Sequence, residues 1–296
     1  MVALAMAGPV SGQIKESDLC HDRAPRTAVY KDVDGATLRV HLFEPIDPAV
    51  TRPRPAIVYF FGGGWVAGDP SQFFPQCAYW ASRGLVAVSA EYRTRSSHGA
   101  SPYDAAMDAR SAVRWIRGNA AELRIDPRRI AVGGGSSGGH LAAAAALLDG
   151  FDDPADDPAV SCRPDALVLL NPVLDAGPDQ TVHGLVKERW REFSPIHSVV
   201  AGAPPTVVFH GTRDRMIPPA VVKRFAARMT EVGARCELYL YDGKGHGFSN
   251  PNQGDGLGFG DVLRMTDQFL RSLGFVTGSP TLDGRRDPAR TRWDDG

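Results

Sequence analysis

Residues 133–140 of this 296-residue chain read Gly133-Gly134-Gly135-Ser136-Ser137-Gly138-Gly139-His140. The segment 129–132, Arg-Ile-Ala-Val, comes directly before this stretch and predicts a buried strand, while 141–148 holds only alanine and leucine and predicts a helix. A serine in a sharp turn between a strand and a helix needs small residues two positions before and after it, because larger side chains would collide there. Strand, glycine-flanked serine and helix together predict a nucleophile elbow, with Ser136 or Ser137 in the turn.

Composition limits the partners that this chain can have. It holds 33 basic and 34 acidic residues, so its formal net charge of −1 gives no electrostatic basis for binding nucleic acid or an anionic membrane. Hydrophobic residues make up 43% of the chain, which is enough for a sizeable core. No apolar run approaches the roughly 20 residues that are needed to span a bilayer. We therefore expect a soluble protein; the sequence indicates no particular oligomeric state.

The spacing of cysteine and histidine predicts no metal site. The four cysteines are scattered, without a C-x-x-C pair, which favours free buried thiols; one or two disulfides would suit a secreted protein. They are Cys20, Cys77, Cys162 and Cys236. The eight histidines show no H-E-x-x-H or comparable ligand spacing. We expect neither a metal nor another cofactor.

Both ends of the chain are expected to be flexible around one domain. Residues 1–24 form the N-terminal segment, in which 2–7 are apolar and end in Ala-Met-Ala, like a signal-peptide cleavage site. The apolar part is short and no basic residue precedes it, so cytoplasmic and secreted locations both stay open. The expected domain covers 25–274, and the polar residues 275–296 predict a flexible tail.

Short apolar runs alternate with helical segments along the domain. The expected strands are 27–30, 37–43, 56–61, 86–91, 130–133, 166–170, 206–210 and 237–241. The expected helices are 72–83, 103–121, 137–148, 220–232 and 261–273. Continuous apolar strands are typical of a parallel sheet that is buried on both faces. The pattern predicts an α/β fold with a doubly wound, mostly parallel sheet of eight strands in one domain, and a small cap region at 175–203 between strands six and seven.

Two residues after later strands could activate the serine. A hydroxyl is a weak nucleophile and needs a base within hydrogen-bond reach, which a third group orients. His246 lies in a glycine-rich loop after the eighth strand and is the best base, although such a histidine can also be an ordinary loop residue. Asp214 follows the seventh strand and is the best candidate for the orienting acid, although it could instead only form an ion pair with a neighbouring arginine. Asp175 is the second candidate for the orienting acid. The order Ser, Asp, His is that of α/β-hydrolases.

A glycine run after the third strand, Phe61-Gly62-Gly63-Gly64-Trp65, can supply donors to a developing oxyanion. We assign that role to the N–H groups of Gly63, Gly64 and Ser137. A tight turn or a phosphate cradle is the alternative, but a cradle would need a Lys-Ser/Thr pair or an acidic partner, and neither is evident. Trp65 is expected to wall the acyl side of the substrate pocket, though a bulky side chain here could equally be core.

These motifs together resemble the hormone-sensitive-lipase-like α/β-hydrolases, and among them the bacterial acetyl xylan and feruloyl esterases. The resemblance covers about 27–273. It implies Ser136 as the nucleophile, because a small residue and then Gly-Gly follow the nucleophile in that family. One departure is that Phe61 stands where the family usually has a histidine that supports the loop, which affects the expected polarity of the pocket and its substrate.

We therefore expect a serine carboxylic-ester hydrolase that acts on small or carbohydrate-linked, acetyl-like esters. Ser136 would attack, His246 would transfer the proton, and Asp214 would hold the imidazolium. A serine exopeptidase is one alternative, with Glu91 and Glu188 as the carboxylates that would grip a peptide amine. A non-hydrolytic or biosynthetic protein that kept the fold is another.

Overall fold

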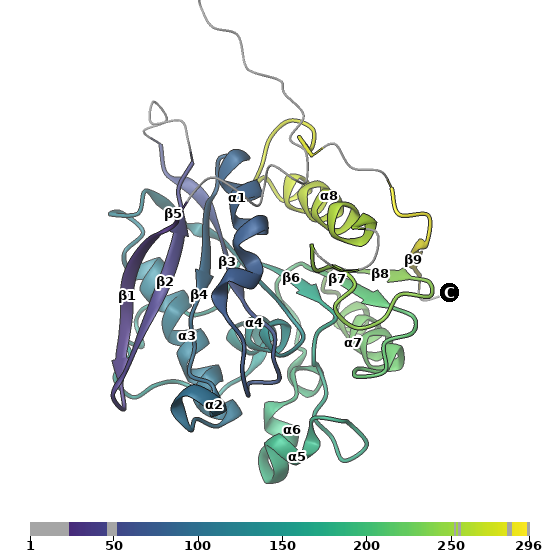
Figure 1. Ribbon diagram of the computed structural model, residues 1–296, viewed down its shortest axis with the longest axis horizontal. Coiled ribbons are helices and arrows are strands. Elements are labelled where there is room, and N and C mark those ends of the chain that lie inside the picture. The colour runs from purple at the N-terminus through teal and green to yellow at the C-terminus, as the bar shows by residue number, and fades with distance from the viewer. Residues whose placement is uncertain (1–23, 46–51, 252, 254–255, 283–285, 295–296) are drawn as a thin grey trace, which may run out of the picture.

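The computed structural model describes residues 24–45, 52–251, 253, 256–282 and 286–294. A twisted nine-stranded sheet crosses the molecule in the order β1-β2-β4-β3-β5-β6-β7-β8-β9 (Figure 1). Its strands are β1 (Arg26–Val33), β2 (Ala36–Phe43), β3 (Arg54–Phe60), β4 (Val86–Ala90), β5 (Ile125–Gly135), β6 (Ala166–Leu170), β7 (Thr206–Gly211), β8 (Cys236–Tyr241) and β9 (Arg290–Trp293). The six strands β3 to β8 run parallel, which confirms the predicted doubly wound α/β sheet.

The burial of each strand follows from its place in the sheet. Every residue of β3, β4, β6 and β7 is buried, as expected for strands that helices cover on both faces. The hairpin β1–β2 lies at one edge, and β2 alternates between buried and exposed positions over most of its length. Asp34 and Gly35, both with positive φ, form its turn, so the predicted hairpin is confirmed.

Helices cover the two faces of the sheet (Figure 1). The long helices are α1 (Phe74–Ser82), α3 (Pro102–Gly118), α4 (Ser137–Leu147), α7 (Pro219–Glu231) and α8 (Leu257–Ser272); η2 (Pro70–Phe73) precedes α1, and α2 (Arg95–His98) precedes α3. Helices α1 and α8 lie together on one face, where the Tyr79 hydroxyl donates to Asp267 at 2.7 Å. Helices α3 and α4 lie on the other face, where Arg110 donates to the Ala144 carbonyl at 3.2 Å.

The segment between β6 and β7 forms the small expected cap. It contains α5 (His183–Val186), η3 (Lys187–Arg189), α6 (Trp190–Phe193) and η4 (Pro195–Ser198). Phe193 is fully buried and its ring packs against His140 of α4, whose Nε2 lies 2.7 Å from the Phe193 carbonyl oxygen, so the segment is attached to the domain by ring packing and by a hydrogen bond. Asp175, the second candidate for the orienting acid, pairs with Arg224 at 2.7 Å.

The C-terminal residues differ from the sequence expectation. We expected 275–296 to be a flexible tail, but β9 pairs antiparallel with β8 and becomes a ninth strand. An edge strand such as β8 offers a row of unpaired backbone groups that a further strand can satisfy. Arg290 also forms an ion pair at 2.7 Å with the fully buried Asp261, which fixes the strand to α8. The expectation for 1–24 lies, apart from Ala24, outside the described residues.

Three absences can be stated for the described part of the chain. Cys77, Cys162 and Cys236 are free thiols, while Cys20 lies outside the described residues. No helix in the described ranges has both the length and the apolar character needed to cross a membrane. Within the same ranges, no group of three or more histidine, cysteine or acidic side chains is arranged to hold a metal ion.

Candidate active site

The glycine-flanked serine forms a tight turn between β5 and α4. Ser136 has φ 56° and ψ −118°, a backbone conformation that costs about 1–3 kcal/mol. A Cβ at Gly138 would lie 2.0 Å from the Phe60 carbonyl oxygen, and one at Gly134 would lie 2.4 Å from the Gly138 carbonyl group. No side chain fits at either position, which is why the turn needs glycine there. The geometry places Ser136 in the turn and Ser137 at the first position of α4.

His246 reaches the serine from the loop after β8. Its Nε2 lies 2.9 Å from the Ser136 Oγ, and its Nδ1 lies 2.8 Å from the Asp214 Oδ2. This pair of bonds fits a neutral imidazole with its proton on Nδ1, so that Nε2 can accept the serine proton. The loop approaches β7 closely: a Cβ at Gly211 would lie 2.3 Å from the Lys244 carbonyl oxygen. The structure thus brings together the three side chains that the sequence predicted.

Asp214 is held in place on both of its oxygens. Its Oδ1 accepts the N–H groups of Met216 at 2.8 Å and Ile217 at 2.9 Å, and its Oδ2 accepts His246. Burial alone would raise the pKa of Asp214, but the hydrogen bonds from His246 and Ile217 outweigh it and keep that pKa below its usual value. The carboxylate therefore stays ionised and oriented. The Nε2 of His210, a residue of β7, lies 3.6 Å from the Asp214 Oδ2 and 3.0 Å from the Ile217 carbonyl oxygen.

The loop after β3 lies beside the serine. Gly63 has φ 137°, and a Cβ there would lie 1.9 Å from the Ala67 carbonyl oxygen; Gly64 has φ 64°. Both glycines line the cavity around Ser136. The N–H of Ser137 is one of the first four in α4, which have no acceptor within the helix. Backbone N–H groups at a helix start favour negative charge, so this corner suits an oxyanion.

One peptide group of this loop is fixed at both ends. The Phe61 carbonyl accepts the Tyr92 hydroxyl at 2.9 Å, and the N–H of Gly62, which belongs to the same peptide group, donates to the Gln72 Oε1 at 2.7 Å. Gln72 in turn donates to the Asn250 Oδ1 at 3.2 Å, which links this loop to the loop that carries His246. Sequence analysis did not identify Gln72, because nothing in η2 marks it as a partner of the glycine run.

Trp65 does not wall the pocket, so this expectation was wrong. Its side chain is 1% exposed and packs against His140 at 5.0 Å and Phe193 at 5.7 Å between ring centroids. The chain turns at Trp65 with φ 58°, and burying so large an apolar ring among aromatic neighbours is favourable. Phe61 is also buried, with its ring stacked on Tyr92 at 4.1 Å, and it does not line this cavity.

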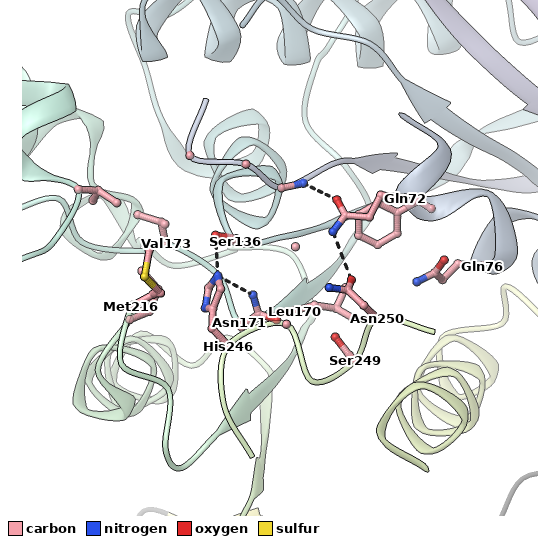
Figure 2. A pocket seen from close by; sticks show the side chains of 18 residues that line it. Gln72, Gln76, Ser136, Leu170, Asn171, Val173, Met216, His246, Ser249 and Asn250 are labelled. Carbon is pink, nitrogen blue, oxygen red and sulfur yellow. Dashed lines mark hydrogen bonds between the residues drawn. The ribbon is translucent and has the colours of Figure 1, made fainter. Parts of the chain in front are cut away.

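A cavity of about 440 Å³ opens beside Ser136 and has two unlike ends (Figure 2). One end contains the apolar side chains of Val173 and Met216; Val182 and Ile217 also line the cavity. The other end contains the polar side chains of Gln72, Gln76, Ser249 and Asn250; Phe73 and Leu170 also line the cavity. Asn171, which sequence analysis also missed, lies between them with its Nδ2 3.4 Å from the His246 Nε2. A polar residue directly after a buried strand was the available signal for Asn171, as it was for Asp214.

Three features define the α/β-hydrolase fold: the order of the strands in the sheet, the nucleophile elbow, and the positions of Asp214 and His246 after parallel strands. Known proteins then identify the family. Residues 45–167 match the family described as BD-FAE, and 170–270 match the prolyl oligopeptidase family. Thermogutta terrifontis esterase 2 is 40% identical with a TM-score of 0.83, covering 86% of this chain and 97% of that one. The chain belongs to the α/β-hydrolase family of carboxylic ester hydrolases.

Curated relatives from Mycobacterium tuberculosis are similar over part of their length. Esterase LipQ is 30% identical over an alignment of 213 residues that covers 65% of this chain and 50% of LipQ. Esterase LipC is 29% identical over an alignment of 267 residues that covers 81% of this chain and 63% of LipC. The chain thus spans half to just under two thirds of these curated relatives.

Proposed function

We propose that this protein hydrolyses short-chain carboxylic esters with Ser136 as nucleophile, His246 as base and Asp214 as orienting acid. The observation that carries the proposal is the unbroken chain of hydrogen bonds from the Ser136 Oγ through His246 to Asp214, at 2.9 and 2.8 Å. A serine activated in this way beside an open cavity suits acyl transfer.

The reaction would proceed in two halves. The Ser136 Oγ attacks the ester carbonyl carbon while His246 Nε2 takes the hydroxyl proton. The tetrahedral intermediate then collapses, the bond to the alcohol oxygen breaks, and His246 gives its proton to the departing alcohol. A water molecule, deprotonated by His246, attacks the acyl-serine and releases the acid with restoration of Ser136. Asp214 stays ionised and stabilises the imidazolium formed in each half.

Three backbone N–H groups would stabilise the oxyanion: those of Gly63, Gly64 and Ser137. Each such donor typically contributes about 3–4 kcal/mol in the transition state. Gly62 is not assigned this role, because its N–H already donates to Gln72.

The size of the cavity supports small acyl groups. Its volume of about 440 Å³ has to hold both substituents of the ester. Structures of the Thermogutta terrifontis esterase include propionate-bound and butyrate-bound forms, which supports acyl chains of similar length for this chain. Acetyl esters, including carbohydrate-linked acetates as the motifs suggest, belong to the same proposal.

Peptidase activity is the second candidate, because 170–270 match the prolyl oligopeptidase family. An exopeptidase needs a carboxylate to bind the peptide amine, yet no described residue that lines the cavity is acidic. Glu91 accepts a hydrogen bond from His41 and the N–H of Arg39, and neither Glu91 nor Glu188 lines the cavity. This arrangement supports ester hydrolysis over peptide hydrolysis.

Turnover of p-nitrophenyl acetate tests the proposal. We expect Ser136→Ala to lose several orders of magnitude in kcat, and Asp214→Asn to lose about 10⁴-fold, with the fold intact by circular dichroism. Asp175→Asn changes the second candidate for the orienting acid, which pairs with Arg224 outside the cavity, and should keep the parent rate. A rate for Ser136→Ala equal to the parent rate would refute the assignment. Faster cleavage of dipeptide arylamides than of sugar and aryl acetates would favour the peptidase instead.

A further inference from the structure

The polar end of the cavity contains a buried amide oxygen that has no hydrogen-bond partner among the described residues. Gln76 lies on α1, and its side chain faces the cavity in Figure 2. The residue is 3% exposed, and its Oε1 is buried without a hydrogen-bond partner among the described residues. Gln72, which lies four residues earlier, is engaged by Gly62 and Asn250. Buried polar groups in native proteins are normally paired, so an unpaired amide oxygen beside a cavity calls for a hydrogen-bond donor from a ligand.

Ser249 adds a second polar group at the same end. It is 3% exposed and lines the main cavity together with Gln76. Both residues also line a smaller cavity of about 10 Å³ behind them, which reaches Phe259 and Thr266 of α8. A space of that size holds about one water molecule and is too small for a substituent of an ester substrate. The substrate would therefore meet the amide and the hydroxyl at the end of the main cavity.

The side chains that line the cavity indicate that its polar end binds a neutral polar group. No Lys, Arg, Asp or Glu occurs among the described residues that line it, so away from Ser136 and His246 it offers no charged side chain to a carboxylate or an ammonium group. A hydroxyl both donates and accepts, so it can pair with the Gln76 amide whichever of its two atoms faces the cavity. The opposite end, with Val173 and Met216, suits a hydrocarbon substituent.

From these observations we infer that Gln76 and Ser249 form a hydroxyl-binding subsite, so that the preferred substrates are esters with one short hydroxylated substituent and one apolar substituent. This inference rests on the proposed ester hydrolysis. An ester of the same shape with a methyl group in place of the hydroxyl would leave the Gln76 Oε1 without a hydrogen-bond partner. We expect the hydroxylated ester to have a kcat/KM about tenfold higher, which corresponds to about 1.4 kcal/mol.

Two pairs of near-isosteric esters test the subsite. Ethyl 3-hydroxypropanoate against ethyl butyrate tests the acyl side, and 2-hydroxyethyl acetate against propyl acetate tests the alcohol side, with acid release followed by pH-stat. We expect the parent to prefer the hydroxylated ester by about tenfold in one pair. Gln76→Met keeps the length of the side chain and should bring the ratio of the two kcat/KM values within that pair close to one. Ser249→Ala should reduce the preference by about threefold.

The controls separate this inference from the proposed function. Gln268→Met makes the same change on α8, outside the cavity, and should keep both rates and their ratio. Equal kcat/KM within both ester pairs, or a preference that persists in Gln76→Met and in Ser249→Ala, would overturn the subsite and leave the esterase proposal standing. Absence of turnover with all four esters would overturn both.

Discussion

Replacing Gln72 with methionine should lower kcat while leaving KM nearly unchanged. The side chain makes one hydrogen bond of 2.7 Å to the Gly62 N–H and one of 3.2 Å to the Asn250 Oδ1. Methionine has a similar length and helical propensity but can form neither bond. Gly62 directly precedes Gly63, whose N–H is proposed to bind the oxyanion, so the loss of these bonds frees the loop next to the reacting carbonyl.

The structure sets bounds on the size of this effect. A neutral hydrogen bond contributes about 0.5–1.5 kcal/mol net, so two of them give about 1–3 kcal/mol if their whole contribution orders the loop. Complete loss of one oxyanion donor costs about 3–4 kcal/mol, which is the upper limit if the loop moves away. We expect kcat to fall about 10- to 100-fold, because each 1.36 kcal/mol is a factor of ten. KM should change little, since the donors act mainly in the transition state.

Steady-state kinetics with p-nitrophenyl acetate measures both parameters. Asn250→Ala keeps the bond to Gly62 and removes only the anchor of Gln72, so its loss in kcat should be smaller than that of Gln72→Met. Ser71→Ala changes an exposed neighbour in η2 and should behave like the parent. The rate of inactivation by paraoxon should fall together with kcat. A Gln72→Met variant that folds normally and keeps kcat within about twofold would refute the reasoning.

Two further predictions concern stability. Asp108 is fully buried and pairs with the buried Arg93, so Asp108→Asn should lower the free energy of unfolding, measured in urea, by about 3 kcal/mol. Glu231→Gln changes an exposed ion pair and should change the free energy of unfolding by less than about 0.5 kcal/mol. Equal effects of the two substitutions would contradict this prediction. Burial lowers the pKa of His140 to about 4, below its unfolded value of about 6.5. The unfolded chain therefore binds a proton at this histidine before the folded protein does. The contribution of His140 to the free energy of unfolding is complete above pH 6.5 and is lost as the pH falls toward 4. His140→Gln should therefore lose about 3 kcal/mol less stability than the parent between pH 7 and pH 4, and identical losses would show that His140 is not the group that titrates.

The placement of three side chains after parallel strands could be predicted from sequence, although Asn171, which directly follows β6, was missed. Ser136, Asp214 and His246 each follow a parallel strand within a short distance in the chain. Parallel strands end at a common edge of the sheet, so side chains more than a hundred residues apart, such as Ser136 and His246, can meet there. The glycines around Ser136 mark a backbone conformation that can be recognised locally. Neither inference requires knowledge of packing between distant elements.

Residues whose role depends on packing could not be predicted. Gln72 and Gln76 are ordinary polar residues before and within a helix, and only the placement of η2 and α1 over the cavity gives them their neighbours. The side chain of Trp65 could be directed to the pocket or to the core, and contact with α4 and α6 decides for the core. In the same way, β9 forms because β8 has a free edge, a property of the assembled sheet and not of residues 290–293.

The support of the glycine loop explains why Phe61 is compatible with the proposed chemistry. The peptide group between Phe61 and Gly62 is held at its oxygen by the Tyr92 hydroxyl and at its nitrogen by Gln72. With both ends bonded, this peptide plane cannot rotate freely, and the path of the chain into Gly63 is fixed. Neither bond involves the side chain of residue 61, whose ring instead stacks on Tyr92. An imidazole at this position is therefore not needed to hold the loop, because a hydroxyl and an amide from two other parts of the fold do so.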